Sequence, residues 1–157
     1  MPQYKKEPIM KQSSHSKKFD VRLHETDLGG IVHHSNYFHW IEETEYSFFL
    51  SIDEPVIGEL DKNNKGTGWP RAEMNIKFLR PLRFRDTLRV DLSIQKIRSA
   101  GIIYAVNIYR LAEEEELVLK GTYSAICCLY STVKDEDPQV IPIPPNFLEK
   151  IECFEQG

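Results

Sequence analysis

One change of hydrophobic spacing along this chain limits the folds that it can adopt. From Tyr37 to Phe48, large apolar residues recur every three or four positions, which is typical of a helix. After residue 70, four successive segments are typical of strands, and in the first three of them apolar residues recur at every second position. One long helix beside a run of consecutive strands predicts an α+β fold, with a mainly antiparallel sheet curved round the helix.

The same spacing gives expected limits for each element. The helix is predicted over residues 36–50, with Ser35 or Asn36 as its N-cap. Three glutamates are expected mainly outside its wide apolar stripe: Glu42, Glu43 and Glu45. The predicted strands cover residues 19–23, 71–78, 88–95, 102–109 and 117–130.

Length and composition predict one domain with two polar ends. The 157 residues, with a mass of 18.3 kDa, suffice for a single hydrophobic core. Residues 1–17 are rich in Lys and Ser and are expected to form a disordered basic arm. Residues 18–131 form the predicted domain. Residues 132–157 are rich in proline and are expected to form an extended C-terminal tail packed on that domain.

Charge and cysteine content exclude several classes of function. Acidic residues outnumber basic ones by 24 to 20, for a net charge of -4, so no nucleic-acid partner is expected. No apolar stretch approaches the roughly 20 residues of a membrane-spanning helix. The three cysteines form no Cys-x-x-Cys pair and no zinc-ligand set, which favours a reducing, cytoplasmic location.

The segment before the helix carries the candidate chemistry. Asp27 follows the first predicted strand, and Gly29 and Gly30 come next, where adjacent glycines permit a tight turn. The helix then begins, and the first amide N–H groups of a helix are unpaired and favour negative charge. A carboxylate folded back toward such amides would combine a reactive oxygen with an oxyanion site, as acyl transfer requires.

This segment resembles a known signature. Residues 27–37 read Asp-Leu-Gly-Gly-Ile-Val-His-His-Ser-Asn-Tyr and match the D-x-x-G-x-V-x-x-x-N-Y pattern of hotdog-fold thioesterases, in the branch of 4-hydroxybenzoyl-CoA thioesterase. Residues 78–88 resemble the second strand and turn of that family, and the likeness extends over residues 18–131. The resemblance implies a hotdog fold, in which an antiparallel sheet of about five strands wraps round one long central helix.

The resemblance also implies roles for individual residues. Asp27 would be the catalytic carboxylate, either as a nucleophile on the thioester carbonyl or as a base on water. Gly30 would be the turn glycine, and the backbone N–H of His34 the oxyanion donor. His33 stands where the family more often has Tyr or Phe, and its imidazole could tune Asp27, contact the acyl group or simply fill that space. Tyr37 is expected in the core or in the lining of the acyl pocket.

Arginines and histidines near this segment each have two interpretations. Arg80, Arg83 and Arg85 flank Pro81 in a predicted turn and could pair with the phosphates of coenzyme A, or form an ordinary solvated loop. Several histidines near Asp27 suggest a metal, but their spacing fits no zinc motif, so neither a metal nor a cofactor is expected.

The function that the resemblance implies is hydrolysis of an acyl-CoA thioester to a free acid and coenzyme A. Two alternatives stay open: a non-catalytic module that binds acyl-CoA or acyl-carrier protein, and a hotdog dehydratase with His33 and Glu43 as its catalytic pair. The resemblance further implies a homodimer or homotetramer with shared active sites. The long strand at residues 117–130 is the expected exposed edge for such association.

Overall fold

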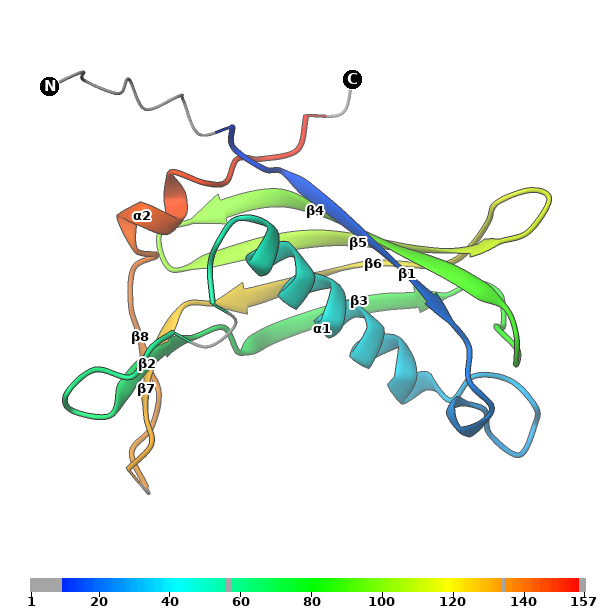
Figure 1. The fold of residues 1–157 in the computed structure, drawn as a ribbon, viewed down its shortest axis with the longest axis horizontal. Helices are drawn as coiled ribbons and strands as arrows, with labels where there is room; N and C mark the ends of the chain where they lie inside the picture. Colours follow the sequence, from blue (N-terminus) through cyan, green and yellow to red (C-terminus); the bar gives the residue numbers. More distant parts are fainter. Residues whose placement is uncertain (1–9, 56–57, 134, 156–157) are drawn as a thin grey trace, which may run out of the picture.

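The structure is a computed structural model that describes residues 10–55, 58–133 and 135–155. Its main sheet contains the strands β1 (Ser14–Asp20), β3 (Arg71–Phe78), β4 (Thr87–Arg98), β5 (Gly101–Leu111) and β6 (Glu116–Ile126). Every neighbouring pair is antiparallel, and the order is β1-β4-β5-β6-β3. One long helix, α1 (His34–Ser51), lies against one face of this sheet (Figure 1). The predicted α+β architecture is confirmed.

Smaller elements flank this main layer. A second sheet, ordered β2-β7-β8, contains β2 (Lys65–Gly68), β7 (Cys128–Ser131) and β8 (Gln139–Val140). It lies at the end of the molecule opposite the loop that precedes α1 (Figure 1). A short 3-10 helix, η1 (Leu23–Glu25), leads into that loop, and a short helix, α2 (Pro145–Leu148), lies near the C-terminus. Within the described residues, no helix is long and apolar enough to cross a membrane.

The hydrophobic core lies between α1 and the main sheet. Alternate residues of β4, from Leu88 to Ile94, are buried, because successive side chains of a strand point to opposite faces. Ile41 and Phe48 of α1 are buried too. The buried face of the strands, which repeats every 2 residues, and the buried face of the helix, which repeats every 3.6 residues, therefore pack against each other in one core.

The helix begins two residues earlier than predicted. Its N-cap is His33, whose Nδ1 accepts a 3.3 Å hydrogen bond from the Ser35 amide, so the prediction of Ser35 or Asn36 as the cap is wrong. Asn36 instead turns its side-chain amide back, donating a 2.8 Å hydrogen bond to the Glu25 carbonyl. That bond anchors the first turn of α1 to the loop that carries Asp27.

The first strand also begins earlier than predicted. β1 pairs with β4 from Ser14 to Asp20, and Gln12 bridges to Ile151, so the expectation of a disordered arm is wrong for residues 12–17. Lys and Ser residues obscured this strand because β1 is at the edge of the sheet, where polar side chains are common. Residues 1–9 of the expected arm lie outside the described residues.

The predicted strand at residues 117–130 is two strands that belong to different sheets. The chain leaves the main sheet at Cys127, whose amide donates a 2.8 Å hydrogen bond to the Ala100 carbonyl. β6 lies between β5 and β3, so the prediction that this strand forms an exposed edge is wrong. The edges of the main sheet are β1 and β3. The C-terminal segment contributes three buried side chains to the core, Ile143, Phe147 and Ile151.

Candidate active site

The loop between η1 and α1 holds Asp27 in a hydrogen-bonded turn. The Asp27 amide donates a 2.8 Å hydrogen bond to the Ile31 carbonyl, and the Gly30 amide donates one of 3.0 Å to the Asp27 carbonyl. Gly30 has a φ of +74°, a left-handed conformation that side chains disfavour, so glycine suits this position of the turn. The Asp27 carboxylate folds back over this turn, and its Oδ1 accepts a 2.7 Å hydrogen bond from the Gly29 amide.

The start of α1 presents a free amide beside this carboxylate. The Val32 amide donates to the Leu82 carbonyl and the His33 amide to the Glu25 carbonyl, at 2.8 and 2.9 Å. The His34 amide, by contrast, donates no hydrogen bond within the described residues. Unpaired N–H groups of this kind, at the positive end of a helix, are suited to hold an oxyanion.

Asp27 and His34 line one pocket with a volume of about 440 Å³. Tyr37 lies on its wall, and the ring of Phe78 packs edge-on against the Tyr37 ring with 5.2 Å between centroids. Burial raises the pKa of the Tyr37 hydroxyl above its ordinary value. Asp27 and His34 are both exposed, so the pocket is open on one side in a single chain. The remaining lining residues come from the loop that precedes α1 and from the segment that follows β3: Ile31, Val32, Leu79, Arg80 and Pro81.

The three predicted arginines do not form one cluster. Arg80 lines the pocket, and its Nε lies 3.6 Å from a Glu116 carboxylate oxygen. Arg83 is not among the lining residues and contacts the Asp27 loop, with its Nη1 3.5 Å from the Gly30 carbonyl oxygen. The Arg85 guanidinium lies over the Phe84 ring and does not line the pocket.

The histidines near Asp27 have structural contacts of their own. The rings of His33 and His34 lie 4.2 Å apart, and His33 Nδ1 lies 2.8 Å from the Ser35 hydroxyl. Glu43, the partner of His33 in the dehydratase alternative, is paired with Lys17 of β1 at 3.2 Å. Among residues 10–55, 58–133 and 135–155, no three His, Cys, Asp or Glu side chains are grouped to hold a metal ion.

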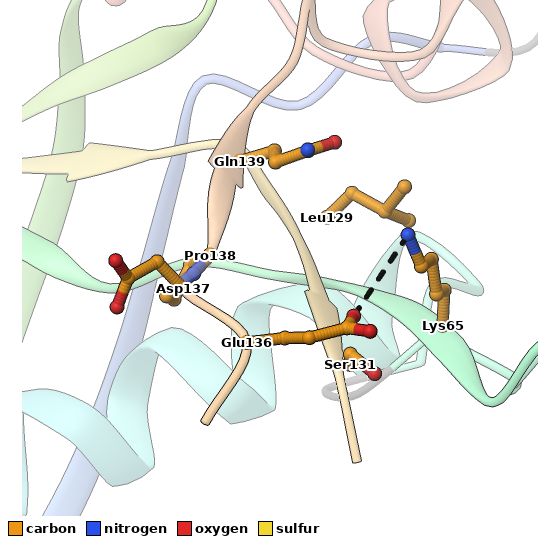
Figure 2. A pocket seen from close by; sticks show the side chains of 7 residues that line it. All are labelled: Lys65, Leu129, Ser131, Glu136, Asp137, Pro138 and Gln139. Atoms are coloured by element: carbon orange, nitrogen blue, oxygen red, sulfur yellow. Dashed lines mark ion pairs between the residues drawn. The ribbon is translucent and has the colours of Figure 1, made fainter. Parts of the chain in front are cut away.

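A separate concavity lies on the small sheet, away from all the predicted site residues. Figure 2 shows Lys65 of β2 pointing toward Glu136, with 3.9 Å between the charged atoms. The volume of this concavity is about 420 Å³, and its walls are mostly polar and charged side chains together with Leu129 and Pro138. None of the predicted site residues lines it.

Sequence analysis missed one buried polar cluster. Glu45 was expected outside the apolar stripe of α1, but it is fully buried and lies 3.3 Å from Arg71 Nη2. The Tyr123 hydroxyl donates a 2.6 Å hydrogen bond to its Oε2. The spacing contained a signal, because Glu45 follows Ile41 by four residues and therefore shares its helix face.

The sequence is similar to those of known thioesterases. The sequence profile of the thioesterase superfamily matches residues 29–116. The Bacillus subtilis (strain 168) protein YneP, whose name assigns it provisionally to the acyl-CoA thioesterases, is 34% identical over 111 residues, which are 71% of this chain and 77% of YneP. The acyl-CoA thioesterase YbgC of Haemophilus influenzae is 25% identical over 113 residues, 69% of this chain and 78% of YbgC.

Solved structures show the same fold. The 4-hydroxybenzoyl-CoA thioesterase from Pseudomonas sp. strain CBS-3 superposes with a TM-score of 0.73 at 18% identity, covering 88% of this chain and 99% of that one. Slr0204 of Synechocystis, a 1,4-dihydroxy-2-naphthoyl-CoA thioesterase, gives a TM-score of 0.70 at 19% identity, covering 88% and 95%. The chain thus has the predicted hotdog fold, and it belongs to the thioesterase superfamily, whose enzymes hydrolyse thioesters.

Proposed function

We propose that this protein hydrolyses an acyl-CoA thioester to a carboxylic acid and coenzyme A at the pocket between Asp27 and His34. One observation carries the proposal: a carboxylate and an unpaired helix-start amide line the same pocket. The names of relatives such as YneP and YbgC support acyl-CoA as the substrate class. The free thiols of Cys127, Cys128 and Cys153 suit a reducing compartment such as the cytoplasm.

The chemistry would use both groups at once. The thioester carbonyl oxygen would accept a hydrogen bond from the His34 amide, which stabilises the negative charge that develops as the carbonyl is attacked. Asp27 Oδ1 is held by the Gly29 amide, and Oδ2 makes no hydrogen bond within the described residues, which leaves it available. Asp27 would either attack the carbonyl and form an anhydride that water opens, or take a proton from an attacking water. In both routes the C–S bond breaks and coenzyme A leaves as a thiolate that is then protonated.

The remaining predicted residues would bind substrate or support the site. Tyr37 and Phe78 offer an apolar wall to the acyl group. Arg80 stands at the pocket and, with Arg83 and Arg85 further along its loop, would meet the phosphates of coenzyme A. We assign His33 a supporting role through its cap on α1, which fixes the orientation of the helix start.

Association of two chains would complete the site. β3 is a free edge of the main sheet, and it ends at Phe78, beside the Asp27 pocket. Met74 and Phe78 are partly exposed on this strand. Unpaired strand edges favour pairing with another chain, and a two-fold dimer joined at β3 would bring neighbouring side chains to the open side of each Asp27 pocket. A homodimer, or a homotetramer built from such dimers, is therefore our proposed assembly.

A panel of acyl-CoA thioesters tests the proposed function. The purified protein should release free thiol and the matching carboxylic acid in equal amounts from at least one member of the panel. A non-catalytic module would bind an acyl-CoA, as calorimetry can show, and release no thiol from it. That outcome across aromatic, short-chain and long-chain thioesters would reject the proposal.

A further inference from the structure

A pocket between α1 and the small sheet contains a carboxylate that the proposed mechanism does not use. Its volume is about 370 Å³, and Phe49, Trp69 and Tyr130 are among its walls. Glu45 and Arg71 also line it. Glu45 follows the start of α1 by eleven residues, so along the helix it lies about 16 Å from the proposed oxyanion site.

Glu45 is the inner member of a buried ion pair, and Arg71 is the outer one. The exposed fractions of their side chains are 1% and 22%. Burial raises the pKa of the Glu45 carboxyl, against the opposing effects of the Arg71 charge and the Tyr123 hydrogen bond. The Arg71 guanidinium lies over the Tyr123 ring, 5.5 Å from its centroid, which fixes the direction of the side chain.

Hydrogen bonding within this cluster is incomplete. Glu45 Oε1, Arg71 Nη2 and the Tyr104 hydroxyl are buried without a hydrogen-bond partner among the described residues. The 3.3 Å approach of Arg71 Nη2 to Glu45 Oε2 is close enough for an ion pair but is not aligned as a hydrogen bond.

Such a cluster is costly for a purely structural feature. An unpaired buried polar group costs about 1–3 kcal/mol, and apolar residues usually replace a buried ion pair without loss of stability. Glu45 and Arg71 line a pocket with aromatic walls. Buried charged groups in such a cleft are typical of ligand recognition.

We propose that this pocket binds a compact, uncharged group that carries a hydroxyl, held between Glu45 and Arg71. A hydroxyl both donates and accepts, so one oxygen satisfies the Glu45 acceptor and the Arg71 donor together. The rings of Trp69 and Tyr130 contact the ring or hydrocarbon part of the same group. An anion is disfavoured because Glu42 lies 4.0 Å from Arg71 and adds a second negative charge to the cluster. The group enters past Arg71, the outer and more exposed partner.

The hydroxyl can come from a free small molecule or from the acyl group of a thioester. The second source rests on the proposed function. β3 runs from Arg71, beside this pocket, to Phe78, beside the Asp27 pocket. In an antiparallel pairing of two β3 edges, the Arg71 end of one chain meets the Phe78 end of the other. An acyl group held at Asp27 of one chain would then extend toward Glu45 of its neighbour.

Binding of two compounds that differ by one hydroxyl, 4-hydroxybenzamide and benzamide, tests the pocket itself. The indole N–H signal of Trp69 in the NMR spectrum of labelled protein, identified with Trp69→Phe, reports occupancy directly. We expect 4-hydroxybenzamide to bind at least about tenfold more tightly, because a site built to bond a hydroxyl rejects the analogue that lacks it. Equal affinities, or no shift of the Trp69 signal with either compound, would overturn the proposal.

Variants of the ion pair give the second measurement. The double variant Glu45→Met/Arg71→Met exchanges the pair for apolar side chains and is expected to fold, which thermal unfolding verifies. It should bind both compounds equally. Arg71→Met alone, at the more exposed position, provides the same comparison if the double variant does not fold. Glu43→Gln, on the exposed face of the same helix, is the matched control and should keep the full preference. A preference that persists in a folded Arg71 variant contradicts the proposed site.

Hydrolysis of benzoyl-CoA and 4-hydroxybenzoyl-CoA distinguishes the two sources. A higher kcat/KM for the hydroxylated thioester that disappears in the Arg71 variants assigns the hydroxyl to the acyl group. Equal kcat/KM values, with the hydroxyl preference kept in the binding experiment, assign it to a free compound. Absence of hydrolysis from any thioester would contradict the proposed function alone, since the Trp69 signal still supports or overturns the pocket.

Discussion

The Tyr123 hydroxyl donates a 2.6 Å hydrogen bond to Glu45 across the core, although the two residues are separated by 78 positions in the chain. This bond joins β6, in the interior of the sheet, to the middle of α1. Its acceptor is a carboxylate in a nearly solvent-free position, so the protonation of Glu45 is linked to folding.

Stability should therefore depend on pH through Glu45. A carboxyl group whose pKa is higher in the folded state binds its proton more tightly there. Its contribution to stability is fully present below its ordinary pKa of 4.5, and is lost as the pH rises through the raised folded value. Glu45→Gln cannot ionise, so urea unfolding from pH 4 to pH 8 should show its stability improving relative to the original protein as the pH rises. Glu43→Gln should show no such trend, and a flat difference for Glu45→Gln would contradict the assignment.

Asp27→Asn should reduce thioester hydrolysis by at least about 100-fold, because the amide can neither attack the carbonyl nor accept a proton from water. Asp27→Glu should also be impaired, since one methylene moves the carboxylate by about 1 Å from its position over the turn. Glu114→Gln, in the exposed β5–β6 turn, removes one charge from a residue that does not line the pocket and should leave the rate unchanged. Activity of Asp27→Asn within about tenfold of the original rate would show that Asp27 is not the reacting group.

Gly121→Ala tests the pairing of β3 with β6. A Cβ at this position would clash with the Asn75 carbonyl oxygen, so the two strands would have to separate. We expect the free energy of unfolding in urea to fall by about 1–3 kcal/mol, as is usual for overpacking. Thr122→Ala, at the next residue in the same strand, adds no atom that could clash with β3 and is the control. Unchanged stability of Gly121→Ala would mean that the register of this edge is different.

Light scattering should show at least twice the 18.3 kDa chain mass at micromolar concentration. Met74→Lys places a charge in the middle of the β3 edge, close to its copy in a two-fold dimer, and should shift the protein toward the monomer. Ser14→Lys makes the matched change on β1, the other edge of the sheet, and should leave the oligomeric state unchanged. A fully active, monodisperse monomer would rule out shared active sites.

Dialysis against a chelator should leave the hydrolysis rate unchanged, because the proposed mechanism uses only a carboxylate and an amide. The histidines that flank Asp27 are engaged in a helix cap and in a ring contact. Loss of activity that zinc or manganese restores would instead identify these histidines as metal ligands.

Local features of the site could be predicted from the sequence because their partners are neighbours in the chain. Asp27, the turn at Gly30 and the start of α1 lie within eight positions, so spacing alone brings them together. The usual preference for Ser or Asn at a helix N-cap gives the wrong residue at the start of α1. The helix cap is His33, whose imidazole nitrogen accepts a bond that Ser or Asn side chains more often accept.

Long-range features could not be predicted in the same way. Alternation identifies a strand and its buried face, but not the strands that pair with it. The sequence therefore does not reveal that β3 crosses over to pair with β6, which puts β6 inside the sheet and not at its edge. The burial of Glu45 depends on Arg71 and Tyr123, which no local pattern connects to α1. Polar edge strands such as β1 resemble tails, because one of their faces and one row of their backbone groups meet solvent.

The bridge between Gln12 and Ile151 places the first and last described segments side by side. The Gln12 amide donates to the Lys150 carbonyl at 2.9 Å, and the Glu152 amide donates back to the Gln12 carbonyl at 3.0 Å. A short linker could therefore join the segments at Gln12 and Ile151, and new ends could be opened in an exposed turn such as residues 113–115 without cutting a strand. Removal of residues 145–155 would destabilise the domain, since it takes away the backbone partner of Gln12 and two side chains of the core, Phe147 and Ile151.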